Sequence, residues 1–260
     1  MELTLNQALK GKATQIKGKE YLTTEAYITP FIERMSKFTD DFRIQAIPAN
    51  QISLTKEGEI NMEDMVYNRM WIQAVMPDEA GFTNHDRVIG MVYGLDTRKP
   101  IVKLYNGGLN RACCNLCVFD PAFLNVQELE PETAINFRPI KHLLEQTSNI
   151  KATLERLSNT EVPYNESAIN ENLGQWIRNT MSKQFTSQFG KVKVSTSTAI
   201  DAFKLLYEDK ESPYYVNPGY STDMFNVYNA FTELISNTDT RDIMNKAEKT
   251  LLLKDILTLS

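Results

Sequence analysis

The chain has 260 residues, 42% of them hydrophobic and 23% charged, and its formal net charge is −5. A chain of this length can bury a sizeable core, and the composition is that of a globular protein rather than of a disordered chain. The first residues lack the apolar run of a signal peptide and no stretch holds the roughly 18 apolar residues of a membrane helix, so we expect a cytoplasmic protein without a membrane partner.

A helix is predicted within residues 23–38. Thr23 or Thr24 is a suitable N-cap, and large apolar side chains recur at helical spacing. Pro30 falls inside the stretch, and because proline suits the first turn of a helix, a start at Pro30 is an alternative. The apolar positions are Tyr27, Phe31, Met35 and Phe38.

Strands are predicted after this helix, because the apolar period changes from helical spacing to alternation. The stretches are rich in β-branched and aromatic residues and are bounded by Pro, Gly, Asp and Asn. They are FRIQAIP (42–48), MVYNRMWIQAVMP (65–77), RVIGMVYGL (87–95), PIVKLYN (100–106) and LNRACCNLCVFD (109–120). An exposed acidic turn is predicted at LTKEGEI, with Gly58 at its tip. Such closely spaced strands indicate one antiparallel sheet.

Helical patterns dominate after residue 132. A first helix is predicted from Pro139 to Leu157, and a second ends at Gly190, a natural helix stop. Further helices are predicted within 195–209, 222–237 and 239–259. The fold class is therefore α+β: a single unit of residues 1–260 with a sheet-rich half (1–132) and a helical half (133–260). We expect the C-terminal helices to pack on one face of the sheet and the other face to be free for a partner.

The three cysteines lie close together at Cys113, Cys114 and Cys117, which does not make a disulfide framework. Three interpretations compete. A structural zinc site would need four ligands and a tight knuckle, and a catalytic thiol would need a base such as His85 or His142. The interpretation that we favour places the cysteines in the core of a strand, preceded by a hairpin turn at Asn106-Gly107-Gly108.

For each of two polar clusters, the interpretation that we favour is a structural role. Glu128, Glu130 and Glu132 either bind a cation or form a solvated edge of the sheet, and the second is favoured. Asn229, Thr232 and Glu233 lie one helical turn apart. If they are buried, they are expected to fix helix packing rather than to catalyse a reaction.

The segments 87–120 and 224–252 resemble two blocks of sequence in a known protein family. Arg111, Cys114 and Asn115 match an arginine followed by a cysteine and an asparagine, and YNAFTEL matches a closing helix. In these blocks, about a quarter of the chain, the sequence resembles a family of phage, prophage and plasmid proteins that carry a domain of unknown function, number 932 (DUF932-like). The resemblance implies a phage or mobile-element origin and location in the host cytoplasm, and it implies no catalytic residue.

Basic residues gather in three stretches without acidic residues: 10–19, 98–111 and 178–200. Each stretch carries four positive charges, although the chain as a whole is acidic. If the stretches meet in space, they form a basic surface that attracts an anionic partner. The alternative is that stretches without acidic residues arise by chance. Single-stranded nucleic acid needs basic grooves with aromatic side chains on which bases stack. The predicted nucleic-acid-binding residues are Arg98, Lys99, Lys103, Tyr105, Arg111, Lys183, Lys191 and Lys193.

Three classes of function follow. The first is a phage nucleic-acid-handling factor that binds or anneals single-stranded DNA. The alternative is a non-enzymatic interaction factor, an inhibitor of host defence or a virion component, whose partners are host or phage proteins. An enzyme is favoured least, because no glycine-rich phosphate loop, nucleophile elbow or paired-carboxylate motif is present. No catalytic residue, metal or cofactor is assigned, and a homo-oligomer is compatible with the first two classes.

Overall fold

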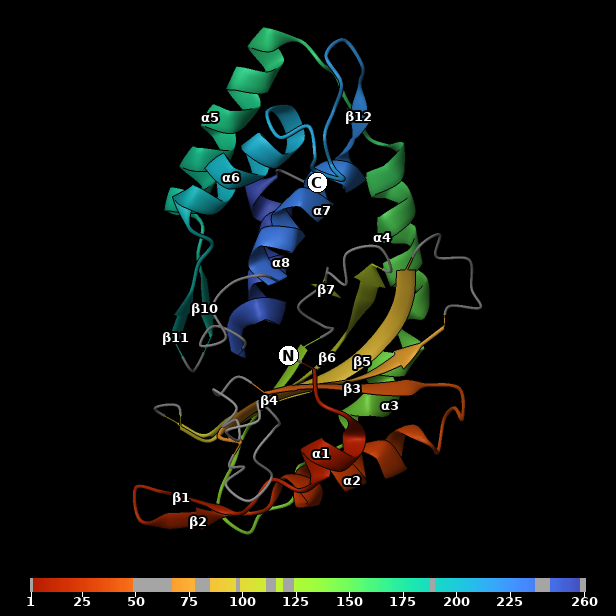
Figure 1. The fold of residues 1–260 in the computed structure, drawn as a ribbon, viewed down its shortest axis with the longest axis vertical. Helices are drawn as coiled ribbons and strands as arrows, with labels where there is room; N and C mark the ends of the chain where they lie inside the picture. Colours follow the sequence, from red (N-terminus) through yellow and green to blue (C-terminus); the bar gives the residue numbers. More distant parts are fainter. Residues whose placement is uncertain are drawn as a thin grey trace, which may run out of the picture.

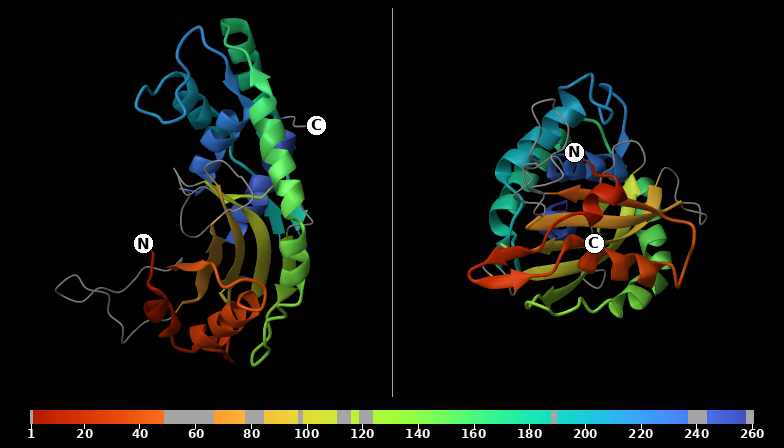
Figure 2. Two further views of the ribbon diagram at one scale, coloured as in Figure 1. Left: turned by 90° about the vertical axis from the view of Figure 1, so that its right-hand side faces the viewer. Right: turned by 60° about the horizontal axis from the view of Figure 1, so that its bottom comes forward.

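A computed structural model describes residues 2–48, 67–77, 85–96, 99–110, 116–118, 124–187, 190–236 and 244–257. It shows a sheet-containing half at one end of the long axis and a mainly helical half at the other (Figures 1 and 2). The predicted turn at LTKEGEI lies outside the described residues, as do Cys113 and Cys114.

The N-terminal half contains a six-stranded antiparallel sheet. Its strands are β3 (Arg43–Pro48), β4 (Arg69–Met76), β5 (His85–Gly94), β6 (Ile101–Asn110), β7 (Leu116–Cys117) and β8 (Leu124–Glu128). They pair in the order β3-β4-β5-β6, and both β7 and β8 pair with β6. Before the sheet come α1 (Leu5–Leu9), the hairpin β1 (Thr14–Ile16) and β2 (Lys19–Tyr21), and α2 (Thr24–Met35), which Thr23 caps and which contains Pro30.

Helices dominate the C-terminal half. They are α3 (Pro139–Glu145), α4 (Thr147–Asn159), α5 (Glu166–Ser182), α6 (Thr196–Tyr207), α7 (Met224–Ser236) and α8 (Lys246–Ile256), with the short strands β9 (Glu161–Val162), β10 (Phe185–Ser187), β11 (Gly190–Val192) and β12 (Thr222–Asp223). The α+β class is confirmed. Two details differ from the prediction: the helix from Pro139 is interrupted at Gln146, and Gly190 begins a strand instead of ending α5.

Both faces of the sheet are covered by helices, which corrects the expectation of one free face. The central strands are buried at nearly every position, so both faces are covered. Side chains from α2 and α3, such as Phe31 and Ile140, pack on one face. Side chains from α4 and α8, such as Leu154 and Leu251, pack on the other. The C-terminal half therefore contributes helices to both faces.

Glycines in β5 and β6 allow close packing, and Gly107 and Gly108 do not form the predicted turn. Asn106, Gly107 and Gly108 lie inside β6, paired with β5. A Cβ added to Gly107 would meet the Cys117 carbonyl oxygen at 2.5 Å, so Gly107 permits the approach of β7. A Cβ added to Gly90 in β5 would overlap the ring of Tyr105.

The interruption between α3 and α4 is supported from the sheet. Asn106 Nδ2 donates to the Leu143 carbonyl at 2.6 Å, and the Arg87 guanidinium donates to the carbonyls of Leu143 and Leu144. These carbonyls belong to the last turn of α3, where a positive charge is also favoured by the helix dipole. The sheet therefore fixes the end of α3.

A separate hydrophobic cluster lies among α4–α8 and includes Trp176, Phe231 and Cys117. The ring centroids of Trp176 and Phe231 are 5.4 Å apart at an interplanar angle of 86°, an edge-to-face contact. Within the parts of the chain that the structure describes, no helix is long and apolar enough to cross a membrane.

Candidate functional site

The predicted nucleic-acid-binding residues do not form one surface. Arg98 and Arg111 lie outside the described residues. Lys99 is exposed, and its Nζ lies 3.1 Å from Glu128 Oε1 in an ion pair. Lys103 is 1% exposed and Tyr105 is 0% exposed. The prediction that Lys103 and Tyr105 face a nucleic acid is therefore corrected: neither side chain reaches the surface.

Tyr105 is held by a buried polar chain that crosses the sheet. Its ring lies over Gly90, which lets its hydroxyl reach β4. There the hydroxyl accepts a hydrogen bond from Trp71 Nε1 and donates one to Gln73 Oε1 at 3.0 Å. Gln73 Nε2 donates in turn to Gln45 Oε1 in β3 at 2.7 Å. Burial raises the pKa of Tyr105 far above its ordinary value, so the hydroxyl stays neutral and the residue is structural.

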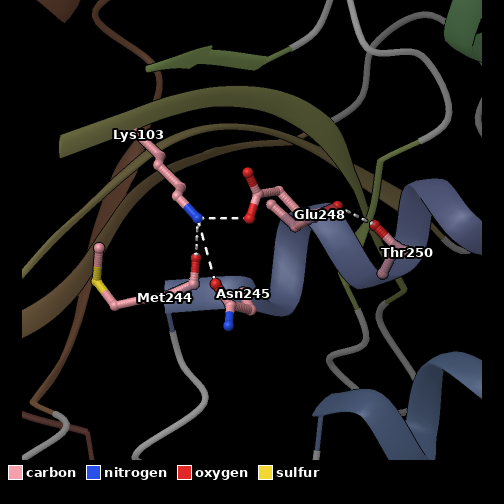
Figure 3. Close-up of polar contacts among 6 residues, drawn as sticks. Lys103, Met244, Asn245, Glu248 and Thr250 are labelled. Atoms are coloured by element: carbon pink, nitrogen blue, oxygen red, sulfur yellow. Dashed lines mark hydrogen bonds and ion pairs between the residues drawn. The ribbon is translucent and has the colours of Figure 1, made fainter. Parts of the chain in front are cut away.

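Lys103 lies at the junction of the sheet with α8, where three acceptors surround its ammonium group (Figure 3). Nζ donates to the Met244 carbonyl at 2.8 Å, to Asn245 Oδ1 at 3.3 Å and to Glu248 Oε2 at 2.6 Å. The Glu248 side chain is fully buried. Because a lysine has three N–H donors, the three acceptors satisfy it completely.

The electrostatics of this pair link the sheet to the helix. Burial lowers the pKa of Lys103 from its ordinary value, and the Glu248 carboxylate opposes that shift. Glu248 also lies in the first turn of α8, where a negative charge is favoured by the helix dipole. Its other oxygen, Oε1, has no hydrogen-bond partner among the described residues, so the carboxylate depends on Lys103.

The positions of Lys103 and Glu248 in the sequence indicate that both are buried, although the search for stretches rich in basic residues assigned Lys103 to a surface. Ile101, Lys103 and Tyr105 alternate along β6 and share one face. Both faces of that strand are apolar, so a lysine on either face is buried. On α8, Glu248 lies three and four positions before Leu251 and Leu252, on the buried side of the helix.

The remaining predicted basic residues surround the hairpin β10–β11. We define the lysine hairpin as residues 183–193, which contain three lysines and no acidic residue. Lys183 and Lys193 are exposed, and neither forms an ion pair within the described residues. Lys191 lies in β11, paired with β10. Val192, between Lys191 and Lys193, is buried against the helices and anchors the hairpin.

Lys246 is a second cation close to the sheet. Its Nζ lies 4.9 Å from the centroid of the Trp71 ring and donates to the Ser236 carbonyl, which ties α7 to the start of α8. Burial, with a smaller contribution from Lys249, lowers the pKa of Lys246 to about 8.

This pKa predicts a pH dependence of stability. An unfolded lysine has a pKa of 10.5, so between about 8 and 10.5 the unfolded chain binds more protons than the folded protein does. The Lys246 contribution to the free energy of unfolding therefore rises with pH in that window. Urea unfolding of the wild type and of Lys246→Gln at about pH 7 and about pH 10 measures it. The wild type should gain stability relative to the variant at the higher pH; a constant or falling difference contradicts this result.

Other sequence candidates occupy structural positions. Cys117 is fully buried in β7, as the strand-core interpretation predicted. His85 is buried against the Phe225 ring, with 5.1 Å between centroids. Thr232 donates to the Asn229 carbonyl at 3.0 Å inside α7. No group of three or more His, Cys, Asp or Glu that could hold a metal ion is present within the described ranges.

The acidic residues at the end of the sheet form surface ion pairs. Glu128 pairs with Lys99, and Glu130 pairs with Lys19 at 3.3 Å. All four side chains are about half exposed or more, which fits the solvated edge that the sequence predicted. Such exposed pairs contribute little to stability.

Comparisons of the chain with protein-family models, with curated proteins and with solved structures found no match. The resemblance to the DUF932-like family therefore stays a prediction.

Proposed function

We propose that the protein is a non-catalytic binding protein for single-stranded nucleic acid and that the lysine hairpin carries the binding. The supporting observation is the exposure of Lys183 and Lys193 beside Lys191 in a segment without a carboxylate, in a chain of net charge −5. Unlike Lys99, neither exposed lysine is neutralised by an ion pair among the described residues. Both are available to phosphate groups.

The chemistry of the segment suits a single strand better than a duplex. The sequence KQFTSQFGKVK combines three lysines with Phe185 and Phe189. Phosphate contacts by lysine give salt-dependent affinity without sequence preference, and bases of single strands stack on aromatic rings. The proposal thus keeps the partner predicted from sequence and moves the binding surface from residues 98–111 to residues 183–193.

The test is the salt dependence of binding to a labelled single-stranded oligonucleotide. Each lost phosphate contact lowers the slope of log K against log salt by about 0.7, so Lys183→Glu with Lys193→Glu should lower it by more than about one. The matched control is Lys37→Glu with Lys254→Glu, which changes two exposed lysines elsewhere and gives the same net charge. Equal slopes for the two double variants would show that the lysine hairpin makes no phosphate contact.

A further inference from the structure

The loop between α6 and β12 presents an aromatic side chain and acidic residues to solvent. We define the acidic loop as residues 208–221. Glu208, Asp209 and Glu211 are exposed near its start, and Tyr220 near its end is 70% exposed. Only Lys210 offsets these charges within the loop.

This loop is ordered by hydrogen bonds to α6 and α7 and by a turn of its own. The Val216 amide donates to the Leu206 carbonyl at 2.8 Å, and Asn226 Nδ2 donates to the Tyr214 carbonyl at 2.9 Å. Pro218 and Gly219, with φ of +86°, form a turn in which the Tyr220 amide donates to the Asn217 carbonyl at 3.1 Å. This arrangement is that of a type II turn. The backbone at Tyr220 is therefore ordered before any partner binds, which reduces the entropic cost of docking.

The opposite end of the molecule carries the complementary charge. We define the basic hairpin as residues 10–19, which contain Lys10, Lys12, Lys17 and Lys19, all exposed. Lys19 pairs with Glu130 at 3.3 Å and Glu20 follows it, so the excess positive charge comes from the other three lysines. At its tip Lys17 has a φ of +52° and precedes Gly18 at +76°. Both central residues of this two-residue hairpin have positive φ, as a type I′ turn requires, so the tip projects the Lys17 side chain from a tight turn. Strands β1 and β2 lie at the lower end of the long axis in Figure 1, and the acidic loop lies at the upper end.

We infer that the chain associates head to tail, with the acidic loop of one copy docking on the basic hairpin of the next. A second copy is the occupant that the charges favour, because one chain carries both complementary surfaces at opposite ends. Two different surfaces in contact make a heterologous interface, which continues into rings or filaments instead of stopping at a dimer. Such an array would place successive lysine hairpins along one nucleic-acid strand, although the association itself does not require nucleic acid.

The test is sedimentation of the full chain without nucleic acid at protein concentrations from about 1 μM to 1 mM, the range of weak association. The wild type should form species larger than dimers that disappear as salt is raised. Lys17→Glu with Lys19→Glu, and separately Glu208→Lys with Asp209→Lys and Glu211→Lys, should each weaken association by about tenfold. Replacing all four lysines of the basic hairpin by Glu, together with the three Lys substitutions in the acidic loop, should restore association, because the charges are then exchanged between the two surfaces.

Two control variants distinguish this interface from a general effect of net charge or of lost stability. Lys37→Glu with Lys254→Glu gives the same net charge as the Lys17/Lys19 variant and should associate as the wild type does. Tyr220→Ala should weaken association without lowering the melting temperature, since the side chain is exposed. A wild type that is monomeric at every concentration overturns the inference. So does loss of oligonucleotide binding in the Lys17/Lys19 variant with association unchanged, which would assign the basic hairpin to nucleic acid.

Discussion

Glu248→Ala is expected to lower the free energy of unfolding by about 3–5 kcal/mol, because it leaves the buried Lys103 ammonium without its carboxylate. The pair is almost completely shielded from water, and the distance between Lys103 Nζ and Glu248 Oε2 is 2.6 Å. Lys103 would keep the Met244 carbonyl and Asn245 Oδ1, which are neutral acceptors. Urea unfolding followed by circular dichroism measures the loss.

Two variants show whether the buried charge causes that loss. Glu128→Ala removes the partner of Lys99 in an exposed ion pair and should cost less than about 1 kcal/mol. Lys103→Met combined with Glu248→Leu removes both buried charges and should be more stable than either single replacement. If Glu248→Ala costs no more than Glu128→Ala, the pair does not hold α8 on the sheet.

Gly90→Ala is expected to be strongly destabilising. Its Cβ would overlap the ring of Tyr105, which is locked between Trp71 and Gln73 and cannot move aside without breaking their hydrogen bonds. Overpacking of this kind costs about 1–3 kcal/mol, and the rigid neighbours place Gly90→Ala at the upper end. The shift in urea midpoint measures it.

The neighbouring strand provides a matched control. Among the described residues, a Cβ on Gly108 would meet His85 Cδ2 alone, at 3.5 Å, so Gly108→Ala should change stability little. Adding Tyr105→Leu to Gly90→Ala should recover part of the loss, because the shorter side chain vacates the space over residue 90. Equal melting temperatures for Gly90→Ala and the wild type would mean that Tyr105 does not pack over residue 90.

Sequence periodicity predicted most of the secondary structure because it reports burial directly. The alternation in β3 and the apolar runs of β4 to β6 identified the sheet, and the N-cap Thr23 identified α2. The turn predicted at Gly107 and Gly108 was wrong because glycine is frequent in turns, whereas here it permits the close approach of β7, a feature of tertiary structure.

The buried pair of Lys103 and Glu248 was harder to predict, because the acceptors of Lys103 lie far from it in sequence. Glu248 is 145 residues from Lys103, so no local motif joins them. Lys103 was assigned to a surface by its charge, although its position between Ile101 and Tyr105 on an apolar strand indicated burial. Lys183 and Lys193, predicted to bind nucleic acid, are exposed, but only the fold shows that they flank a hairpin.

The most direct test of the proposed binding surface compares Tyr105→Phe with Lys183→Glu plus Lys193→Glu in two measurements, oligonucleotide binding at about 50 mM salt and melting temperature. Tyr105→Phe removes a buried hydroxyl with two partners, so it should lower the melting temperature and leave binding unchanged. The lysine variant should lose binding and keep its melting temperature, since both side chains are exposed. Absence of binding by the wild type, or loss of binding only in Tyr105→Phe, would contradict the assignment of the lysine hairpin as the nucleic-acid-binding surface.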